Sequence, residues 1–397
     1  MQKLDVRPIN VILDAGFGDA GKGITTDMVC NKLGKKDSTK EIINVRFSGG
    51  PQAGHTVYVG DKMHIFSSFG SGSFRKNVTT YLLPSALMDP ICVYNEFQVL
   101  KEKGVTPKLV VHPDVPVITP YDVFDNRACE TTLKNGSCGR GIRATYKRNE
   151  TKYSLKARDL KYPKILQLRL SSIKNGYYAN HPELKMDDFF NAVSFFLENF
   201  EIKELDFEKL NCQVVYEGSQ GLLLDRYLGF YPNTTPSRTG LQALKEIEEI
   251  PDKGGYGTTR YGCRTYGVDV YLVTRAYQTR HGNGFMTNED RGHNIMDNPY
   301  EINHFNKYQG EFRKTILDLD LLEYAISSHG LNPEICHLVI THLDLVQNAL
   351  TFTYKDEVFH FSKESEFVEA IARILGTKRL FVSHGPDSDN IQEVERN

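Results

Sequence analysis

A glycine-rich segment near the start of the chain has the residue types of a phosphate-binding loop. It follows the apolar run Ile9–Leu13 and places Gly16, Gly21 and Lys22 at P-loop spacing, before a helical pattern from about Ile24. In such a loop the backbone N–H groups, the helix N-terminus and the lysine ammonium all face a phosphate. The segment therefore predicts a nucleotide phosphate site.

Two residues distinguish this segment from an ordinary P-loop. Gly23 stands where a P-loop has the Ser or Thr that binds magnesium, and Asp19 places a carboxylate inside the loop. A carboxylate repels a phosphate unless it holds a metal ion or moves a proton. The segment thus indicates acid–base or metal chemistry beside a phosphate. The alternative is a strand–helix turn that is merely rich in glycine.

Three more glycine clusters follow, at 48–56, 136–141 and 217–221. The first contains His55, whose imidazole is an acid–base candidate. The third follows a predicted strand and carries Gln220, whose amide can bind a base or a carbonyl group. Clusters that follow strand ends predict one crevice at the carboxyl edge of a sheet.

The elements that position these clusters are predicted from hydrophobic patterns. Short β-branched runs indicate buried strands, and apolar residues three and four apart indicate helices over Asp187–Asn199 and Asp318–Ser328. Their alternation predicts an α/β fold: a single large domain over 1–397, with a central, mainly parallel sheet covered by helices. Residues 286–312 are polar and predict exposed loops. The predicted strands are Ile9–Leu13, Ile42–Val45, Leu109–Val111, Val214–Tyr216, His337–Ile340 and Leu380–Val382.

The composition argues against several classes of protein. The 397 residues carry 48 Lys and Arg against 50 Asp and Glu, so the net charge of −2 does not favour nucleic acid or an anionic membrane as a partner. No apolar stretch approaches the roughly 20 residues of a membrane span. Seven scattered cysteines, an odd number without a C-x-x-C pair, favour a reducing, cytoplasmic location.

Eight segments, in order along the chain, resemble motifs of the adenylosuccinate synthetase family. Gly16–Gly23 resembles the loop G-x-W-G-D-E-G-K-G, and Gly49–Thr56 resembles G-G-x-N-A-G-H-T. Gly136–Ile142 is similar to T-x-x-G-I-G-P, with Cys138 where a phosphate-binding Thr is usual. The other segments are Glu217–Asp225 (E-G-A-Q-G-x-x-L-D), Tyr231–Ser237 (Y-P-x-V-T-S-S), Thr279–Gly284 (T-R-V-G-x-G), Thr341–Asp344 (T-K-L-D) and Val382–Asp387 (T-G-P-D).

The resemblance implies the family fold and a GTP-dependent ligase that converts IMP, L-aspartate and GTP to adenylosuccinate, GDP and phosphate. The purine is first phosphorylated at O6. As the resemblance implies, Asp19 takes the N1 proton, His55 donates a hydrogen bond to the transferred phosphoryl group, and Lys22 stabilises its oxygens. Gln220 would hold O6, and Mg²⁺ would be bound by Asp19 and the Gly54 carbonyl group together with phosphates.

The resemblance also implies how the two nucleotides are held. Asp344 would accept the guanine N1–H and 2-amino hydrogen bonds, although His342 replaces the usual Lys beside it. Lys152 stands where the family has an Arg that reaches across the interface of a homodimer. The implied nucleotide-binding residues are Gly18, Gly21, Gly23, Gln52, Ser137, Cys138, Lys152, Thr235, His342, Asp344, Ser383, Gly385 and Pro386.

The amino-acid site is where the chain departs most from the family. The family's aspartate loop is a Thr-Thr-Gly followed by arginines, and the corresponding stretch here is Gln309–Thr315. Arg313 and Lys314 keep two cations for substrate carboxylates, whereas Glu311 stands about where an Arg is expected. The amino-acid substrate is therefore open.

Three other functions are consistent with parts of the pattern. Phage-type relatives use dGMP and make the 2-amino-2′-deoxy product, but the resemblance implies that they replace the loop carboxylate with a small residue, so Asp19 argues against this function. A nucleotide-binding regulatory protein would not need Asp19, His55 and Lys22 together. A generic P-loop NTPase is disfavoured by Asp19 and Gly23.

Overall fold

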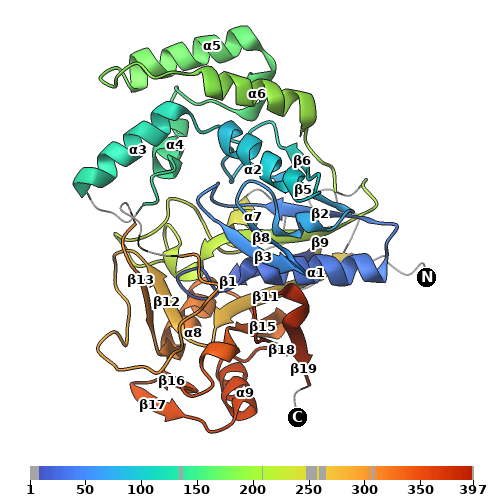
Figure 1. The fold of residues 1–397 in the computed structure, drawn as a ribbon, viewed down its shortest axis with the longest axis vertical. Coiled ribbons are helices and arrows are strands. Elements are labelled where there is room, and N and C mark those ends of the chain that lie inside the picture. The colour runs from blue at the N-terminus through green and yellow to red at the C-terminus, as the bar shows by residue number, and fades with distance from the viewer. Residues whose placement is uncertain are drawn as a thin grey trace.

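A ten-stranded sheet crosses the centre of the computed structural model, which describes residues 9–133, 137–207, 209–246, 257–258, 265–303, 305 and 309–395. Within these residues the strand order is β19-β18-β15-β11-β1-β8-β2-β5-β6-β7 (Figure 1). Every neighbouring pair is parallel except β18 and β19. The strands of the sheet are β1 (Ile9–Asp14), β2 (Glu41–Arg46), β5 (Val78–Leu82), β6 (Lys108–Val111), β7 (Glu201–Ile202), β8 (Cys212–Gly221), β11 (Val268–Arg275), β15 (Cys336–Thr341), β18 (Arg379–Ser383) and β19 (Ile391–Val394).

The predicted α/β fold with a mainly parallel sheet is confirmed, and each of the six predicted runs lies within a strand of this sheet. Four strands of the sheet had no prediction. In β11, Asp269 and Arg275 interrupt the apolar run, and in β5 two threonines do so. These two segments form strands because each pairs in parallel with a neighbouring strand on both sides.

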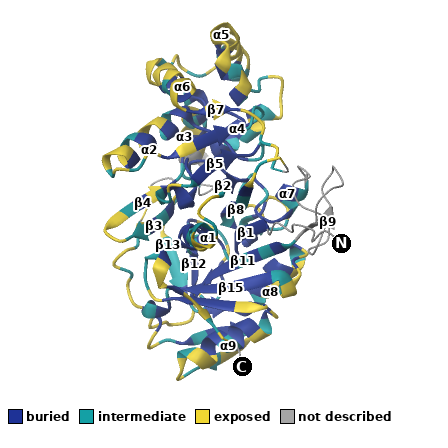
Figure 2. Cartoon of the chain, turned by 90° about the vertical axis from the view of Figure 1, so that its right-hand side faces the viewer, coloured by how far each residue is buried: buried dark blue, intermediate teal, exposed yellow. Residues whose placement is uncertain are grey.

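The buried side chains of the sheet pack into separate hydrophobic clusters on its two faces. Val11 and Leu13 of β1 belong to one hydrophobic cluster, while Ile12 belongs to another that includes Ile24 and Met28 of α1 (Lys22–Lys36). This alternation follows from the two-residue period of a strand. Figure 2 shows the central strands buried and the outer helices α5 and α6 partly exposed.

Helices cover the sheet, and the two predicted helical patterns agree with the structure. The pattern over 187–199 forms α6, and Asp318 is the N-cap of α8, because its carboxylate accepts a hydrogen bond from the Asp320 backbone N–H. Helix α1 begins at Lys22, two residues before the predicted start. The other helices are α2 (Pro90–Glu102), α3 (Pro120–Leu133), α4 (Ile142–Asn149), α5 (Pro163–Ser172), α6 (Asp187–Asn199), α7 (Gln242–Glu246), α8 (Leu319–Ser328) and α9 (Glu364–Ile374).

Outside the main sheet, the described residues form three strand pairs and one three-stranded sheet. The polar region predicted as loops over 286–312 connects β12 (Gln278–His281) to β13 (Phe312–Thr315). In the described part of the chain, no helix is long and apolar enough to cross a membrane. The domain boundary at 1–397 stays a prediction. The remaining strands are β3 (His55–Val59), β4 (Lys62–Phe66), β9 (Gly257–Thr258), β10 (Thr265–Tyr266), β14 (Leu317–Asp318), β16 (Thr351–Tyr354) and β17 (Glu357–His360).

Candidate active site

Six neighbouring strands, from β18 through β15, β11, β1 and β8 to β2, end at one edge of the sheet. β1 ends at Asp14, directly before the glycine loop, and β8 ends at Gly221. β11 ends at Arg275 and β15 ends at Thr341, one residue before His342. Parallel topology therefore brings the loops that follow these strands to one place, as the sequence predicts.

The Asp14 carboxylate organises the glycine loop from inside. It is fully buried and accepts hydrogen bonds from the backbone N–H groups of Gly16, Gly18 and Ala20, at 2.9, 3.3 and 3.0 Å. The Lys22 ammonium lies 2.8 Å from the same carboxylate. These donors, which the sequence predicts to face a phosphate, therefore bind an internal anion in this structure. The donors left for a ligand are those at the N-terminus of α1.

Gly23 has a packing reason that the sequence does not reveal. A Cβ atom at this position would lie 2.9 Å from the His55 Cβ and 3.1 Å from the Thr56 carbonyl oxygen. Such a contact is too close, so α1 packs directly against β3 only because residue 23 has no side chain. The hydroxyl of an ordinary P-loop would displace His55.

Asp19 lies at the turn of the loop with a positive φ of 59°. Its backbone carbonyl oxygen accepts a hydrogen bond of 2.7 Å from the Arg275 Nε. No side chain or amide among the described residues donates to its carboxylate. Burial raises the pKa of Asp19, while Lys22 and Arg275 lower it. The carboxylate is thus available to accept a proton or to bind a cation.

The residues at Asp19 would suit a magnesium ion whose other positions are filled by phosphate or water oxygens. Mg²⁺ is a hard ion that takes one or two protein oxygens and keeps phosphate or water oxygens at its other positions. Asp19 offers an unpaired carboxylate, and Gly54 lines the same cavities. The described residues contain no cluster of three His, Cys, Asp or Glu side chains that would form a cage for a metal ion on their own.

His55 is held from behind by a buried carboxylate. The His55 Nδ1 lies 2.5 Å from the Glu217 Oε1, and the Ser71 hydroxyl donates to the same oxygen. The other oxygen, Oε2, accepts from the Ser71 backbone N–H at 3.0 Å and from the Asn44 amide at 3.1 Å. The Arg46 guanidinium lies 4.0 Å from Glu217. This network fixes the imidazole, whose second nitrogen, Nε2, lies 3.4 Å from the Ser219 carbonyl oxygen at the cavity wall.

The ionisation of this pair follows from its contacts. Burial by itself would raise the pKa of Glu217, but Arg46, His55 and Ser71 together lower it to about 2. Burial lowers the pKa of His55, and the hydrogen bond to Glu217 opposes that shift. Because Glu217 is ionised, it accepts the proton on the His55 Nδ1. A phosphoryl oxygen near Nε2 would favour the imidazolium.

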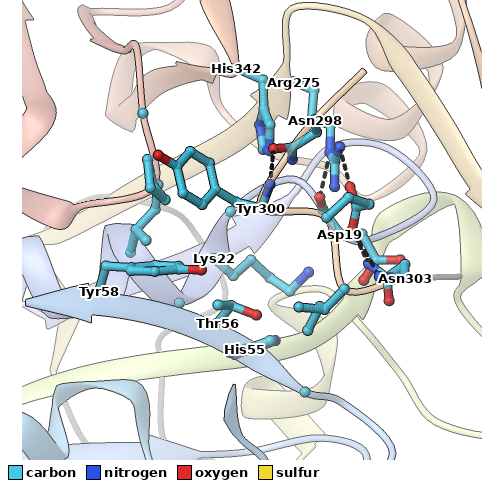
Figure 3. Close-up of a pocket in the computed structure, with 18 of the residues that line it drawn as sticks. Asp19, Lys22, His55, Thr56, Tyr58, Arg275, Asn298, Tyr300, Asn303 and His342 are labelled. Carbon is cyan, nitrogen blue, oxygen red and sulfur yellow. Dashed lines mark hydrogen bonds and ion pairs between the residues drawn. The ribbon is translucent and has the colours of Figure 1, made fainter. Parts of the chain in front are cut away.

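Two cavities meet at Asp19 and His55. The first, which we call the Asp344 cavity, extends from the start of α1 to the loops after β15 and β18 (Figure 3). It is lined by Asp19, Gly21, Lys22, Gly23, Ile24, Gly54, His55, Thr56, Tyr58, Arg275, Asn298, Tyr300, Glu301, Ile302, Asn303, His342, Asp344, Gly385 and Pro386.

The second, which we call the Gln220 cavity, has a volume of about 300 Å³ and extends in the other direction, toward α4. Asp19, Gly54, His55, Ile302 and Asn303 line both cavities. The residues that line only the second are Phe17, Gly18, Gln52, Ala53, Ser137, Cys138, Ile142, Arg143, Ser219, Gln220, Leu224, Asn233, Thr234, Thr235, Pro236, Arg280, His281, Asn283 and Gln309.

The far end of the Asp344 cavity carries polar groups suited to a base. The Asp344 Oδ1 is buried and has no hydrogen-bond partner among the described residues, and burial raises its pKa. His342 has a positive φ of 60°, and its Nδ1 lies 2.8 Å from the Thr341 hydroxyl. Burial lowers the pKa of His342 well below its usual value. A neutral imidazole and an acceptor without a partner among the described residues therefore suit a ligand with N–H donors.

A strap of residues, 298–303, crosses the junction of the two cavities. The Glu301 carboxylate lies 3.0 Å from the Arg275 guanidinium, and it accepts a hydrogen bond of 2.9 Å from the Asn303 amide. The Tyr300 ring packs edge-to-face against Tyr58, with 5.8 Å between ring centroids. Figure 3 shows the two tyrosines beside one another and Asn303 next to Asp19. The strap thus covers the point where the cavities join.

Most residues predicted for the site line these two cavities, and four do not. Ser383 is buried behind the Asp344 cavity, where its hydroxyl donates to the Gly385 carbonyl oxygen. Lys152 is exposed, with its ammonium over the Tyr153 ring. Arg313 and Lys314 lie on β13, outside both cavities. Gly136, quoted in a motif, lies outside the described residues.

Arg313 and Lys314 have partners of their own in the β12–β13 connection. The Arg313 guanidinium donates to the Gly282 and Gly284 carbonyl oxygens, both at 2.8 Å, and lies 2.6 Å from the Glu289 carboxylate. The Lys314 ammonium lies 2.7 Å from Asp297. These partners occupy the cations predicted to bind the amino acid.

Several residues in contact with the junction have no role in the prediction from sequence. Asp14 and Arg275 are buried charged residues at the ends of β1 and β11, and Glu217 is a buried charged residue within β8. Their burial depends on the strand order, which the sequence alone does not show. A charged residue at the end of an apolar run was the available signal for Asp14 and Glu217. No sequence feature indicated a role for Arg275, because the strand that carries it, β11, was not predicted.

Comparison with known proteins gives a consistent result. The family model of adenylosuccinate synthetase matches residues 11–353. Adenylosuccinate synthetase of Pelodictyon phaeoclathratiforme is 28% identical, over 85% of this chain and 76% of the relative. That of Borrelia recurrentis is 25% identical, over 98% of this chain and 90% of the relative.

Two solved structures share the fold. Fully ligated adenylosuccinate synthetase from Plasmodium falciparum superposes with a TM-score of 0.75 at 18% identity, covering 97% of this chain and 99% of its own. Succinoaminodeoxyadenylate synthetase of cyanophage S-2L, bound to dGMP and to dATP as an energy donor, superposes with a TM-score of 0.63 at 15% identity, covering 98% and 96%.

Proposed function

Because the chain belongs to the adenylosuccinate synthetase family of C–N bond-forming ligases, we propose that it joins L-aspartate to C6 of IMP at the expense of GTP. One observation carries this proposal: two cavities meet at Asp19 and His55. A ligase that transfers a phosphoryl group between two nucleotides needs two sites that open onto the same catalytic groups. GTP would occupy the Asp344 cavity, and IMP would occupy the Gln220 cavity.

The first step transfers the γ-phosphoryl group to the purine. Asp19 removes the proton from N1 of IMP, the O6 oxygen attacks the γ-phosphorus, and the bond from that phosphorus to the β–γ bridging oxygen breaks, which releases GDP. The unpaired Asp19 carboxylate supports its role as base. His55, oriented by Glu217, would donate from Nε2 to the transferred group. Lys22 would move from Asp14 toward the phosphates or neutralise them at a distance.

The second step forms the C–N bond. The aspartate amine attacks C6, the C6–O6 bond breaks, and inorganic phosphate leaves with the proton that the amine gives up. Gln220 and Gln52 both line this cavity, and the Gln52 Oε1 is buried without a hydrogen-bond partner among the described residues. We propose that these amides hold the purine. Arg313 and Lys314 stay the proposed cations for the amino acid, and would have to exchange their present partners for its carboxylates.

Mg²⁺ is the proposed metal, held by Asp19, the Gly54 carbonyl group and phosphates, where it would neutralise the charge on the transferred group. A homodimer in which Lys152 reaches the partner's nucleotide, and a cytoplasmic location, are further proposals. The exposed position of Lys152 supports the first, and the cysteine pattern supports the second.

The direct test is product analysis. We would incubate the protein with aspartate and Mg²⁺, with IMP or dGMP as acceptor and GTP or ATP as donor, and identify the product by mass. Adenylosuccinate from IMP and GTP is expected. The 2-amino-2′-deoxy analogue from dGMP would move the chain to the phage-type activity, and no condensation in any combination would overturn the ligase proposal.

A further inference from the structure

The Gln220 cavity contains a cation that the family motif does not predict. In the segment T-x-x-G-I-G-P, the residues of this chain at the last four positions are Gly141, Ile142, Arg143 and Ala144. Arg143 thus stands at a glycine of the motif and lines the cavity. A guanidinium in place of a hydrogen atom adds a full positive charge to the wall of a ligand site.

Arg143 is held in place but keeps most of its donors. It lies in the first turn of α4, and its Nη2 donates to the Thr234 carbonyl oxygen at 2.9 Å. A guanidinium has five N–H donors, and among the described residues no carboxylate lies within ion-pair distance of this one. The side chain is half-buried, so its remaining donors are only partly solvated. It is therefore a fixed cation without a carboxylate partner in the part of the chain that the structure describes.

The neighbours of Arg143 indicate an anion rather than a carbonyl group or a base. Ser137 and Cys138, which precede α4, and Thr235 line the same cavity. Arg280 of β12 is far from Arg143 in the sequence but lines the same cavity. Its Nη2 donates to the Asn233 carbonyl oxygen at 3.0 Å. The guanidinium groups of Arg143 and Arg280 thus donate to the carbonyl oxygens of two consecutive residues. Among the described residues that line this cavity, Asp19 is the only carboxylate, and it lies at the junction. A dianionic ligand group fits this end of the cavity.

We infer that Arg143 binds the 5′-phosphate of the purine monophosphate, so that each chain supplies its own guanidinium for this group. The inference rests on the proposed function, which places a purine monophosphate in the Gln220 cavity. The purine ring must lie at the junction with Asp19 and His55, where its O6 and N1 react. Arg143 lines the Gln220 cavity but not the Asp344 cavity, so it lies away from the reacting atoms.

This assignment makes the phosphate site less dependent on a second chain. Lys152, which the resemblance assigns to the partner's nucleotide, is exposed and lies outside the cavity of its own chain. A planar guanidinium binds two phosphate oxygens at once, whereas an ammonium acts as a point charge. Arg143 therefore supplies the stronger contact.

The test measures equilibrium binding of IMP, dGMP and inosine by calorimetry, without a triphosphate. Arg143→Ala should weaken IMP about tenfold or more, the size of a lost charge-assisted hydrogen bond, and leave inosine unchanged. Arg143→Gln removes the charge but keeps an amide donor for the Thr234 carbonyl oxygen, and should show the same loss. Arg226→Ala is the matched control, because Arg226 is exposed and pairs with Glu150 outside the cavity.

Two results would overturn the inference. One is unchanged IMP affinity in both variants, and the other is an equal loss for IMP and inosine, which would mean that Arg143 only holds the 233–235 loop. If the unaltered protein binds IMP or dGMP tightly and the variants do so too, this inference fails while the proposed function stands. If the unaltered protein binds neither monophosphate, both fail.

Discussion

The Asp344 cavity and the Gln220 cavity share a catalytic junction but differ at their far ends. The first ends at Asp344, a carboxylate with an unpartnered oxygen, and the second contains the guanidinium groups of Arg143 and Arg280. One cavity thus presents an acceptor to the N–H groups of a base, and the other presents donors to an anion. Under the proposed function, the base of one nucleotide and the phosphate of the other would be selected at these two different ends.

The cations also differ between the two cavities. In the Asp344 cavity Lys22 is paired with Asp14, and Arg275 is paired with Glu301. Arg143 has no such partner among the described residues. Under the proposed function, a triphosphate would therefore displace or share protein counter-ions in the first cavity, whereas a monophosphate would meet a cation without a carboxylate partner among the described residues in the second. The first cavity is the one expected to rearrange on binding.

The largest expected effect comes from the junction itself. Asp19→Asn keeps the shape of the side chain and removes the base, so kcat should fall by about 10²–10⁴. Because Asp19 must be ionised and its pKa is raised, the unaltered protein should lose rate as the pH falls through that pKa. The variant should lack this acidic limb. Unchanged kcat would remove Asp19 from the mechanism, and calorimetry with IMP checks that the site is intact.

Glu217→Gln should have the next largest effect, because it acts through His55. Loss of a hydrogen bond to a charged group should lower kcat by about 10- to 100-fold. Since Glu217 raises the pKa of His55, the variant should have a still lower His55 pKa, and the basic limb of kcat should move to lower pH. Imidazole proton NMR measures this pKa. A loss of kcat with no shift in His55 would mean that Glu217 is only structural.

Asp344→Asn tests the base-selecting end of the Asp344 cavity. The carboxylate accepts from both N1–H and the 2-amino group of guanine, and adenine has neither donor there. The preference for GTP over ATP in kcat/KM should drop about tenfold or more, while the KM for IMP should not change. Asp356→Asn, an exposed carboxylate, is the control. An unaltered protein that prefers ATP would contradict this role.

Arg313→Ala should give the smallest effect and concerns the third substrate. If Arg313 exchanges its present partners for the amino acid, the KM for aspartate should rise about tenfold, with the nucleotides unchanged. Lys314→Ala is the matched variant on the same strand. An equal rise in KM for IMP would instead assign Arg313 to the Gly282 and Gly284 carbonyl groups that it holds, next to the Gln220 cavity.

The sequence by itself determined the class of fold and the places of the glycine clusters. The runs at Ile9–Leu13, Val214–Tyr216 and His337–Ile340 are apolar because both faces of a parallel sheet are covered, and that pattern is local. Asp19 and His55 were recognisable from their neighbours in sequence. Both line the two cavities, although their catalytic roles stay predictions.

Only the tertiary structure decided which charged groups are paired. Asp14 and Lys22 are eight residues apart, yet their ion pair forms because the loop folds around a buried carboxylate. His55 and Glu217 are separated by 162 positions, and they meet because β2, the strand before His55, is the neighbour of β8, which carries Glu217. Charge pairing depends on distances in space and on burial, and neither can be predicted from the spacing of residues along a chain.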